Sequence, residues 1–363
     1  MAGNKKDLHA LRAEIDSVDV ELLRMINVRA QLAVDVGQLK QDSGEDVVFY
    51  RPEREAAILR RVLEQNSGPL PSAEAVRLMR EIMSACLALE RQLRIAYLGP
   101  EGTYTHLATL KHFGSSIKSA PASSIGDVIR DVEAGSADFG VVPVENSLEG
   151  GVNQTLDSLR DSPLRICGEV VLSIHHQLLS NVNDISEIKQ VYAHAQALGQ
   201  CRRWLSENLS HAQFIPVSSN GEAARRVREE VDVAAIAGAV AADIYSLNTL
   251  RKNIEDHPGN TTRFVVLGNS SPPPSGKDVT SIMFTAPNRP GALHDVLGVL
   301  SGAKISMTRI ESRPLRQESW DYVFFVDLEG HSETDRVRDA LLEIEAKTSQ
   351  LKILGSYPRA ILS

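Results

Sequence analysis

The stretch RIAYLGPEGTY, residues 94–104, marks the point where the pattern of this chain changes from helical to alternating strand and helix. Residues 95–98 form a short apolar run that ends at a glycine, which predicts a buried strand. A glycine turn over residues 99–102 follows, and the pattern then favours a helix as far as Phe113. A new domain is therefore predicted to begin at residue 94.

The chain before this stretch is predicted to be an all-α domain, residues 1–93. No proline interrupts residues 6–40, and apolar residues recur there at helical spacing, which indicates one long amphipathic helix. The helical pattern is broken at two places, first by a polar loop at residues 41–46 and then by the segment SGPLP at residues 67–71. The predicted helices span residues 6–40, 53–65 and about 72–93.

After the same stretch, strand and helix alternate, which is the pattern of an α/β domain. We expect this domain to span residues 94–269. Short apolar runs separated by helix-like segments predict its further strands at residues 139–144, 166–172, 213–217, 233–236 and 263–267.

A third domain is expected after the segment SSPPPS, residues 270–275. Consecutive prolines stay extended and cannot enter a helix or a sheet interior, so residues 270–278 are predicted to be a linker. Residues 279–363 then follow a βαββαβ order of ferredoxin-like type. The predicted elements are strand 279–286, helix 291–303, strands 305–313 and 319–328, helix 332–347 and strand 350–355.

Composition limits the partners of the chain. A formal net charge of -8 disfavours a general binder of nucleic acid or of anionic membranes, because binding phosphates requires a surplus of Lys and Arg. Any anionic substrate must then meet locally placed arginines. The three cysteines are far apart without the spacing of metal ligands, so neither a zinc site nor disulfides are expected. The charged N-terminus lacks the apolar run of a signal peptide, and we expect a cytoplasmic protein.

Cations on the first predicted helix suggest an anion site. Arg29 and Lys40 are eleven residues apart, so they point the same way at a separation of roughly 16 Å and could hold a small dianion between them. Arg12 lies about 25 Å before Arg29 along the axis and is rotated away, so it could share that ligand only from a second copy of the chain. The alternative is that these residues are solvated cations on an amphipathic helix.

Three segments of the α/β region combine polar residues with strand ends or turns: GPEGTY at 99–104, VPVENS at 142–147 and NTTRF at 260–264. In α/β domains ligands bind beyond the carboxyl ends of strands, which makes these segments candidates for a site. Each is weak evidence alone. The glycine turn lacks the third glycine and the downstream acid of a dinucleotide site, and Glu145 could be a helix cap or a surface group.

Taken together, these segments and HAQAL at 194–198, followed by Gln200 and Cys201, resemble the prephenate dehydratases over residues 94–268. The residues Arg12, Arg29, Gly37, Lys40, Arg54, Glu55 and CLALE at 86–90 resemble the all-helical chorismate mutases over residues 6–92. PNRPGAL at 287–293 and ESRP at 311–314 resemble the ACT domain of phenylalanine-regulated dehydratases. The chain is thus similar to the bifunctional chorismate mutase/prephenate dehydratase family of phenylalanine biosynthesis.

The resemblance implies an intertwined homodimer with a mutase pocket that takes one arginine from the partner chain. Arg12 and Arg29 would hold carboxylates, Lys40 the ether oxygen, and Arg54 and Glu55 the remaining carboxylate and hydroxyl. Arg51 stands where an Asp is found in the family and Cys86 where a Ser is usual, so contacts to the hydroxyl are open.

Glu90 is a further departure, because it takes the place of a Gln that donates to the ether oxygen. An ionised carboxylate there would repel the developing oxyanion, so we expect Glu90 to act only when protonated and mutase activity to be favoured by acid. The alternative is an exposed Glu near a helix end.

For the dehydratase, the resemblance implies two α/β lobes around a cleft. The reaction is expected to need neither a metal nor a cofactor. Thr262 is predicted to donate a hydrogen bond to the departing hydroxyl, and Arg263 to act as carboxylate anchor or orienter. A Thr hydroxyl is a poor acid and needs a polarising partner, and the alternative is an ordinary β-branched strand residue. The predicted pocket residues are Glu145, Asn146, Ser147, Gln196 and Phe264.

For the C-terminal domain, the resemblance implies that phenylalanine binds between paired domains and inhibits the enzyme. Gly291 would leave backbone amides at a helix start open to an amino-acid carboxylate. Alternatively, Pro and Gly in these segments are only turn formers. The predicted effector residues are Gly291, Ala292, Leu293, Glu311, Ser312, Arg313 and Pro314.

Two rival functions are less consistent with the sequence. A mutase fused to a prephenate dehydrogenase would need a GxGxxG turn for a nicotinamide cofactor, and the sequence contains none. A non-catalytic amino-acid sensor would not need Thr262, Arg263 or the cationic residues of the first domain. The expected substrates are therefore chorismate and prephenate.

Overall fold

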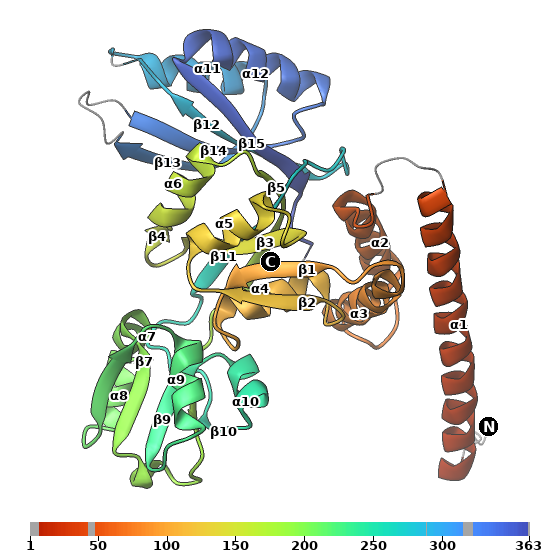
Figure 1. The fold of residues 1–363 in the computed structure, drawn as a ribbon, viewed down its shortest axis with the longest axis vertical. Helices are drawn as coiled ribbons and strands as arrows, with labels where there is room; N and C mark the ends of the chain where they lie inside the picture. Colours follow the sequence, from red (N-terminus) through yellow and green to blue (C-terminus); the bar gives the residue numbers. More distant parts are fainter. Residues whose placement is uncertain (1–6, 43–47, 288, 315–321, 362–363) are drawn as a thin grey trace, which may run out of the picture.

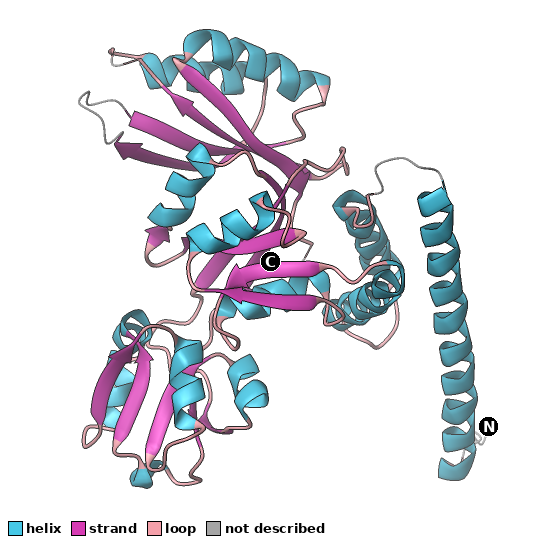
Figure 2. Cartoon of the chain, in the orientation of Figure 1, coloured by secondary structure: helices cyan, strands magenta, loops and turns pink. Residues whose placement is uncertain are grey.

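The computed structural model describes residues 7–42, 48–287, 289–314 and 322–361. Figure 1 shows the C-terminal α/β unit at the top, one α/β lobe in the middle, a second α/β lobe at the bottom and a helical unit at the side, with α1 outermost. Figure 2 shows that helices flank the sheets in all three α/β parts. The expected multidomain architecture is confirmed.

The helical unit consists of α1 (Leu8–Asp42), α2 (Pro52–Gln65) and α3 (Ser72–Glu90). Pro52 begins α2, as suits a residue without an N–H at the first helical position. The third helix ends earlier than predicted, because the chain is already extended at Arg91. Helix α1 packs on α3 but leaves many large apolar side chains exposed, among them Leu11, Ile15, Val18, Leu22 and Met25.

The first α/β lobe is built on a sheet with strand order β2-β1-β3-β11-β5, and β4 pairs with β3. Its helices are α4 (Tyr104–Phe113), α5 (Ile125–Glu133) and α6 (Asn153–Asp161). The strands are β1 (Arg94–Leu98), β2 (Lys118–Ala122), β3 (Phe139–Asn146), β4 (Gly150–Gly151), β5 (Arg165–Ser173) and β11 (Thr261–Gly268).

The second lobe is inserted between β5 and β11, so the chain crosses between the lobes twice. The two crossings lie side by side, since the Ile174 N–H donates to the Asn260 carbonyl over 2.8 Å. The sheet order is β10-β6-β9-β7-β8. Its elements are β6 (Gln177–Ser180), a short 3-10 helix (Ile185–Glu187), β7 (Gln190–His194), α7 (Ala195–Gln200), α8 (Arg202–Asn208), β8 (Gln213–Val217), α9 (Asn220–Val227), β9 (Val233–Ala237), α10 (Ala239–Tyr245) and β10 (Asn248–Arg251).

The C-terminal unit has the predicted βαββαβ order and an antiparallel sheet ordered β13-β14-β12-β15. One face of this sheet packs on the first lobe, and the two share a core in which Phe325 and Leu354 lie with Leu156 and Ile166. At Gly355 a Cβ would overlap the backbone of Ile166, so only glycine permits this approach. The elements are β12 (Asp278–Thr285), α11 (Ala292–Gly302), β13 (Met307–Pro314), β14 (Tyr322–Glu329), α12 (Asp335–Lys347) and β15 (Gln350–Pro358).

The segment between β11 and β12 also touches the helical unit. The Arg60 guanidinium on α2 donates to the carbonyls of Ser275 and Lys277, over 2.7 and 2.9 Å. Within the described residues, no helix combines the length and the apolar character needed to cross a membrane.

Candidate active sites

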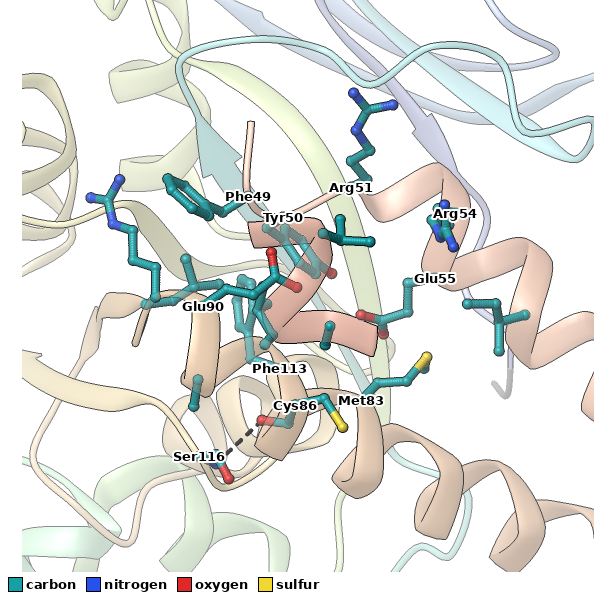
Figure 3. Close-up of a pocket in the computed structure, with 18 of the residues that line it drawn as sticks. Phe49, Tyr50, Arg51, Arg54, Glu55, Met83, Cys86, Glu90, Phe113 and Ser116 are labelled. Atoms are coloured by element: carbon teal, nitrogen blue, oxygen red, sulfur yellow. Dashed lines mark hydrogen bonds between the residues drawn. The ribbon is translucent and has the colours of Figure 1, made fainter. Parts of the chain in front are cut away.

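A cavity of about 500 Å³ lies between the three helices of the first unit. All but one of the residues predicted for the first site line it. Figure 3 shows Arg54 and Glu55 on α2 and Cys86 and Glu90 on α3 around this space. Arg29 and Lys40 reach it from α1, three turns apart as their spacing required.

Arg12 is the predicted residue that does not line this cavity. It lies in the N-terminal half of α1, is exposed, and is seventeen residues from Arg29, about 25 Å along a helix. The exposed apolar side chains of α1 lie around it. Within one chain, Arg12 therefore cannot reach the ligand that Arg29 would hold.

Among the described residues, Glu90 is one of the two acidic residues that line this cavity, with Glu55. Its side chain is only 9% exposed, and its Oε2 lies 3.3 Å from the Lys40 Nζ. At Gly37 a Cβ would come within 3.1 Å of the Glu90 Cγ, so glycine lets Glu90 lie against α1. The departure seen in the sequence is therefore a buried carboxyl group facing a lysine, not an exposed glutamate at a helix end.

Glu55 is held by a residue that the sequence analysis did not single out. Arg80 on α3 places its Nε 3.1 Å from the Glu55 Oε1, and both side chains are 16% exposed. Burial raises the pKa of Glu55, and Arg80 opposes the rise. Arg80 also donates to the Lys111 carbonyl at the end of α4, so this wall of the cavity joins the first α/β lobe.

A second cavity of about 930 Å³ lies between the two α/β lobes. Of the residues predicted for it, Asn146, Gln196, Thr262 and Phe264 line it. Among its described lining residues there is no Arg or Lys, in contrast to the helical cavity. Further polar residues around the cavity include Tyr104, His176, Gln200, Asn220 and Asn260, together with the acids Glu149 and Glu222.

Thr262 has the polarising partner that a hydroxyl donor needs. The Asn146 Nδ2 donates to the Thr262 Oγ1 over 2.8 Å and to the Asn260 Oδ1 over 2.8 Å. Because the Thr262 oxygen accepts this bond, its own proton is available to a ligand in the cleft. Asn260 extends this series of hydrogen bonds, since its Nδ2 donates to the Gln200 Oε1 over 3.1 Å.

His176, where the polypeptide crosses between the lobes, is the last residue in this series of hydrogen bonds. Its Nε2 lies 2.8 Å from the Gln200 Oε1, and its Nδ1 lies 2.9 Å from the oxygen of the Tyr104 hydroxyl, which donates to the His175 carbonyl over 2.8 Å. Burial lowers the pKa of His176, which favours the neutral imidazole. His176 was not predicted from the sequence, although two adjacent histidines after an apolar strand were a visible signal.

Glu145, Ser147 and Arg263 do not face the cleft. In the β3/β11 pair Thr262 lies opposite Asn146 and Arg263 opposite Glu145, and successive side chains of a strand point to opposite faces. Thr262 and Asn146 therefore border the cleft, while Arg263 and Glu145 point toward the C-terminal unit. Of the two roles predicted for Arg263, carboxylate anchor or orienter, the anchor does not fit this geometry.

The partners of these residues account for their orientation. The Glu145 Oε2 lies 3.0 Å from the Arg309 Nε of β13. The Ser147 Oγ accepts from the Thr261 N–H over 2.9 Å, so it fastens β3 to β11. The predictions of Glu145 and Ser147 as pocket groups are therefore corrected: the first is an ion-pair partner and the second a link between strands.

The predicted effector segments lie in two places on the C-terminal unit. Gly291 has φ +83 and precedes α11, and Ala292 and Leu293 turn into the core. Asn288 of the motif PNRPGAL lies outside the described residues. The segment Glu311, Ser312, Arg313 and Pro314 ends β13.

This second segment touches the wall of the cleft. A Cβ at Gly151 would come within 2.9 Å of the Glu311 carboxylate, and Gly151 lines the cleft. The Arg313 Nη1 donates to the Asn153 carbonyl of α6 over 2.8 Å.

Comparison with known proteins divides the chain in the same order. Three family models match it: chorismate mutase type II over residues 11–91, prephenate dehydratase over residues 95–272 and the ACT domain over residues 280–346. Together these matches cover the helical unit, the two lobes and most of the C-terminal unit.

Individual relatives agree with these matches. A bifunctional chorismate mutase/prephenate dehydratase of Pseudomonas aeruginosa is 50% identical over 363 residues, which covers 99% of this chain and 100% of that protein. A prephenate dehydratase of Mycobacterium sp. is 39% identical over 279 residues, 73% of this chain and 89% of that protein. The crystal structure of the prephenate dehydratase of Arthrobacter aurescens in complex with L-Phe has 33% identity and a TM-score of 0.68, over 75% of this chain and 93% of that one.

Proposed function

The chain belongs to the family of bifunctional chorismate mutase/prephenate dehydratases, and from this premise we propose how its two cavities divide the work. It rearranges chorismate to prephenate and converts prephenate to phenylpyruvate. We assign the first reaction to the helical cavity and the second to the cleft between the lobes. The contrast in cations carries this assignment, because several Arg and Lys residues line the first cavity, whereas the described lining of the second has none and combines hydroxyl and amide groups with two histidines and the acids Glu149 and Glu222.

The mutase reaction is an intramolecular Claisen-type rearrangement, so it needs shape and fixed charge but no nucleophile or base. Arg29 and Arg54 are proposed to hold the two carboxylates, which would fix the compact conformer and supply the entropic part of catalysis. Lys40 would stabilise the negative charge that grows on the ether oxygen as the C–O bond breaks. The Lys40–Glu90 distance of 3.3 Å puts Glu90 beside the same oxygen.

A homodimer would complete this cavity. The exposed apolar side chains of α1 need a cover, and burying each would contribute about 1.5 to 3 kcal/mol. Arg12 lies among them, about 25 Å from the site in its own chain. A second α1 packed against the first would cover the apolar side chains and bring Arg12 of the partner subunit to the carboxylate end of the cavity.

In the dehydratase reaction the bond to the ring carboxylate breaks, CO2 leaves, and the electron pair moves into the ring and expels the hydroxyl group. Thr262 is proposed to donate a hydrogen bond to that hydroxyl while Asn146 donates to Thr262. The departing hydroxide takes a proton to leave as water, and the ring becomes aromatic. With Arg263 turned away, the substrate carboxylates are assigned to uncharged donors of the cleft, namely the side-chain amides of Gln196 and Asn220.

The C-terminal unit is proposed to bind phenylalanine and to inhibit the dehydratase. The Arthrobacter aurescens relative is described in complex with L-Phe, and its match extends over three quarters of this chain. The backbone amides at the start of α11, exposed by Gly291, would receive the carboxylate of the amino acid. Glu311 and the rest of its segment would complete the site at the junction of paired units.

A coupled assay tests the whole assignment. The full-length chain is supplied with chorismate, and phenylpyruvate is followed with and without NAD and with and without phenylalanine. Phenylpyruvate should form without NAD, and phenylalanine should suppress it while prephenate accumulates. Product that depends on NAD, or prephenate as the only product without phenylalanine, would contradict the assignment of the cleft.

A further inference from the structure

Arg263 occupies an unusual position, because both of its neighbours on β11, Thr262 and Phe264, line the cleft while its own guanidinium lies on the other face of the sheet. Every nitrogen of that guanidinium has a partner. Nε donates to the Glu169 Oε2 over 2.8 Å, Nη2 donates to the Tyr357 hydroxyl over 2.8 Å, and Nη1 is bonded to Asp327.

The C-terminal unit supplies two of these three partners, Tyr357 and Asp327, and Ser281 of the same unit lies between them. Tyr357 lies on β15, Asp327 on β14 and Ser281 on β12, between them. The Ser281 hydroxyl bonds both to Asp327 and, over 2.7 Å, to the Tyr357 hydroxyl. Arg263, Tyr357, Ser281 and Asp327 therefore form a closed ring of hydrogen bonds that joins β11 to the middle of the other sheet.

A second contact runs parallel to this ring. Glu145, opposite Arg263 in the register, lies 3.0 Å from the Arg309 Nε, and the Arg309 Nη2 lies 3.6 Å from the Glu311 carboxylate. Glu311 belongs to the proposed effector segment and touches Gly151 in the wall of the cleft. The same two strands that carry Thr262 and Asn146 are thus held on their far side by charged groups of the C-terminal unit.

Adhesion between the two units does not depend on these charges, because the shared apolar core already holds the sheets together. The side chains of Arg263, Glu169 and Asp327 are 16%, 8% and 6% exposed. Buried ion pairs of this kind add little net stability compared with apolar residues of similar size, but they fix geometry and are costly when one partner is lost. The buried ion pairs of Arg263 are therefore better suited to fixing the position of β11 than to holding the two units together.

We infer that Arg263 is a positioning residue, not a substrate anchor, and that it transmits the state of the C-terminal unit to Thr262. A shift of β14 or β15 would move the guanidinium, and with it the adjacent Thr262 relative to Asn146. The effector would then act on the hydrogen bond that orients the catalytic hydroxyl. This inference rests on the proposed dehydratase function of the cleft.

The test compares full-length Arg263→Gln, Asp327→Asn and their double variant with the wild type. Three quantities are measured: kcat and KM for prephenate, the phenylalanine concentration for half inhibition, and mutase activity as an internal control for folding. Each single variant should lower the dehydratase kcat about tenfold with KM nearly constant, and should shift half inhibition about fivefold or more. The double variant should be no worse than the poorer single variant, since both break one ring.

Two further variants make the comparison specific. Tyr357→Phe removes one bond of the ring with almost no change in shape, and should show the same changes to a smaller degree. Arg165→Gln is the matched control, because Arg165 also donates across to the C-terminal unit, at Ile353, but lies opposite Gly268 at the far end of β11. It should leave kcat, KM and half inhibition unchanged.

The outcomes separate the possible roles of Arg263. A KM raised about a hundredfold in Arg263→Gln, with Asp327→Asn like the wild type, would mean that Arg263 anchors the substrate, and the inference would fail. A lower melting temperature with unchanged kinetics and inhibition in both single variants would reduce the ring to a structural contact, and would also overturn it. Absence of phenylpyruvate with the wild type would refute the proposed function itself, and the inference with it.

Discussion

The helical cavity and the cleft between the lobes differ in what a single chain can complete. In the cleft, the proposed donor Thr262 and its partners Asn146, Asn260 and Gln200 come from one polypeptide and are joined in turn by hydrogen bonds. The helical cavity has its cations in place but lacks Arg12, and α1 leaves an apolar surface exposed. A site made of fixed charges on a long helix can be shared between subunits, whereas a site that orients one hydroxyl depends on the strands beside it.

The largest effect is expected from removing, one at a time, the two arginines that the proposed mutase site takes from different subunits. Arg12→Ala and Arg29→Ala should each lower mutase activity about a thousandfold, because each removes a charge that fixes the substrate and stabilises the transition state. Co-expression of the two variants should restore about a quarter of the wild-type activity, since about half of the dimers are hybrids and each hybrid has one intact site. The measurement is the rate of prephenate formation.

The dehydratase activity of the same preparations is the control for this complementation, and it should stay at the wild-type level throughout. If the mixture remains as inactive as its parents although hybrid dimers are present, the two arginines act within one chain. The mutase site would then be made by a single chain, like the cleft, and the difference between the two sites would not exist.

The complementary experiment targets the cleft. Thr262→Ala should lower the dehydratase kcat about a hundredfold, because a positioned donor contributes on the order of 10² to 10⁴ in rate. Thr262→Ser keeps the hydroxyl group beside Asn146 and should retain most of the activity. Mutase activity should be unchanged in both variants. Dehydratase turnover in Thr262→Ala equal to that of the wild type would remove Thr262 from the mechanism.

A smaller effect should distinguish the two sites by pH. A protonated Glu90 would donate to the ether oxygen and an ionised one would repel the charge that grows there, so the mutase kcat/KM should fall as the pH rises. Glu90→Gln supplies an uncharged donor at every pH and should flatten this profile. The dehydratase profile, recorded on the same samples, should not respond to the substitution. Equal mutase profiles for both proteins would show that Glu90 does not act on the reacting oxygen.

The sequence predicted the helical cavity better than the cleft, for a physical reason. Positions along one helix have fixed distances and directions, so the spacing of Arg29 and Lys40 was enough to predict that both would face one cavity. In the cleft, the face to which a side chain points depends on strand register. Thr262, Arg263 and Glu145 come from equally suggestive motifs, yet only Thr262 faces the cleft.

Other parts of the fold could not be predicted because their signals are not local. The strands β2, β6, β7 and β10 were not predicted, since each is only four or five residues long and polar residues or a proline interrupt its pattern. Arg80 and His176 act through partners far away in the sequence, Glu55 and Gln200. Such contacts become visible only once the chain is folded.

The smallest effect concerns the contact between the helical unit and the first α/β lobe. The Tyr50 hydroxyl, from the rim of the helical cavity, lies 3.1 Å from the His112 Nε2 on α4 of the first lobe. Burial, reinforced by Arg80, lowers the pKa of His112 to about 3. The unfolded chain therefore binds a proton first as the pH falls from about 6.5 toward 3, and the folded form loses stability in that window.

At pH 5 this loss should be about 1 to 2 kcal/mol, and His112→Gln should remove it because the amide does not titrate. The measurement is the drop in melting temperature between pH 7 and pH 5, which should be a few degrees smaller in the variant than in the wild type. His211→Gln is the matched control, since His211 is exposed on the second lobe and should leave the drop unchanged. Equal drops in all three proteins would mean that His112 takes up its proton in the folded protein, so that the contact between the helical unit and the first lobe tolerates a charged imidazole.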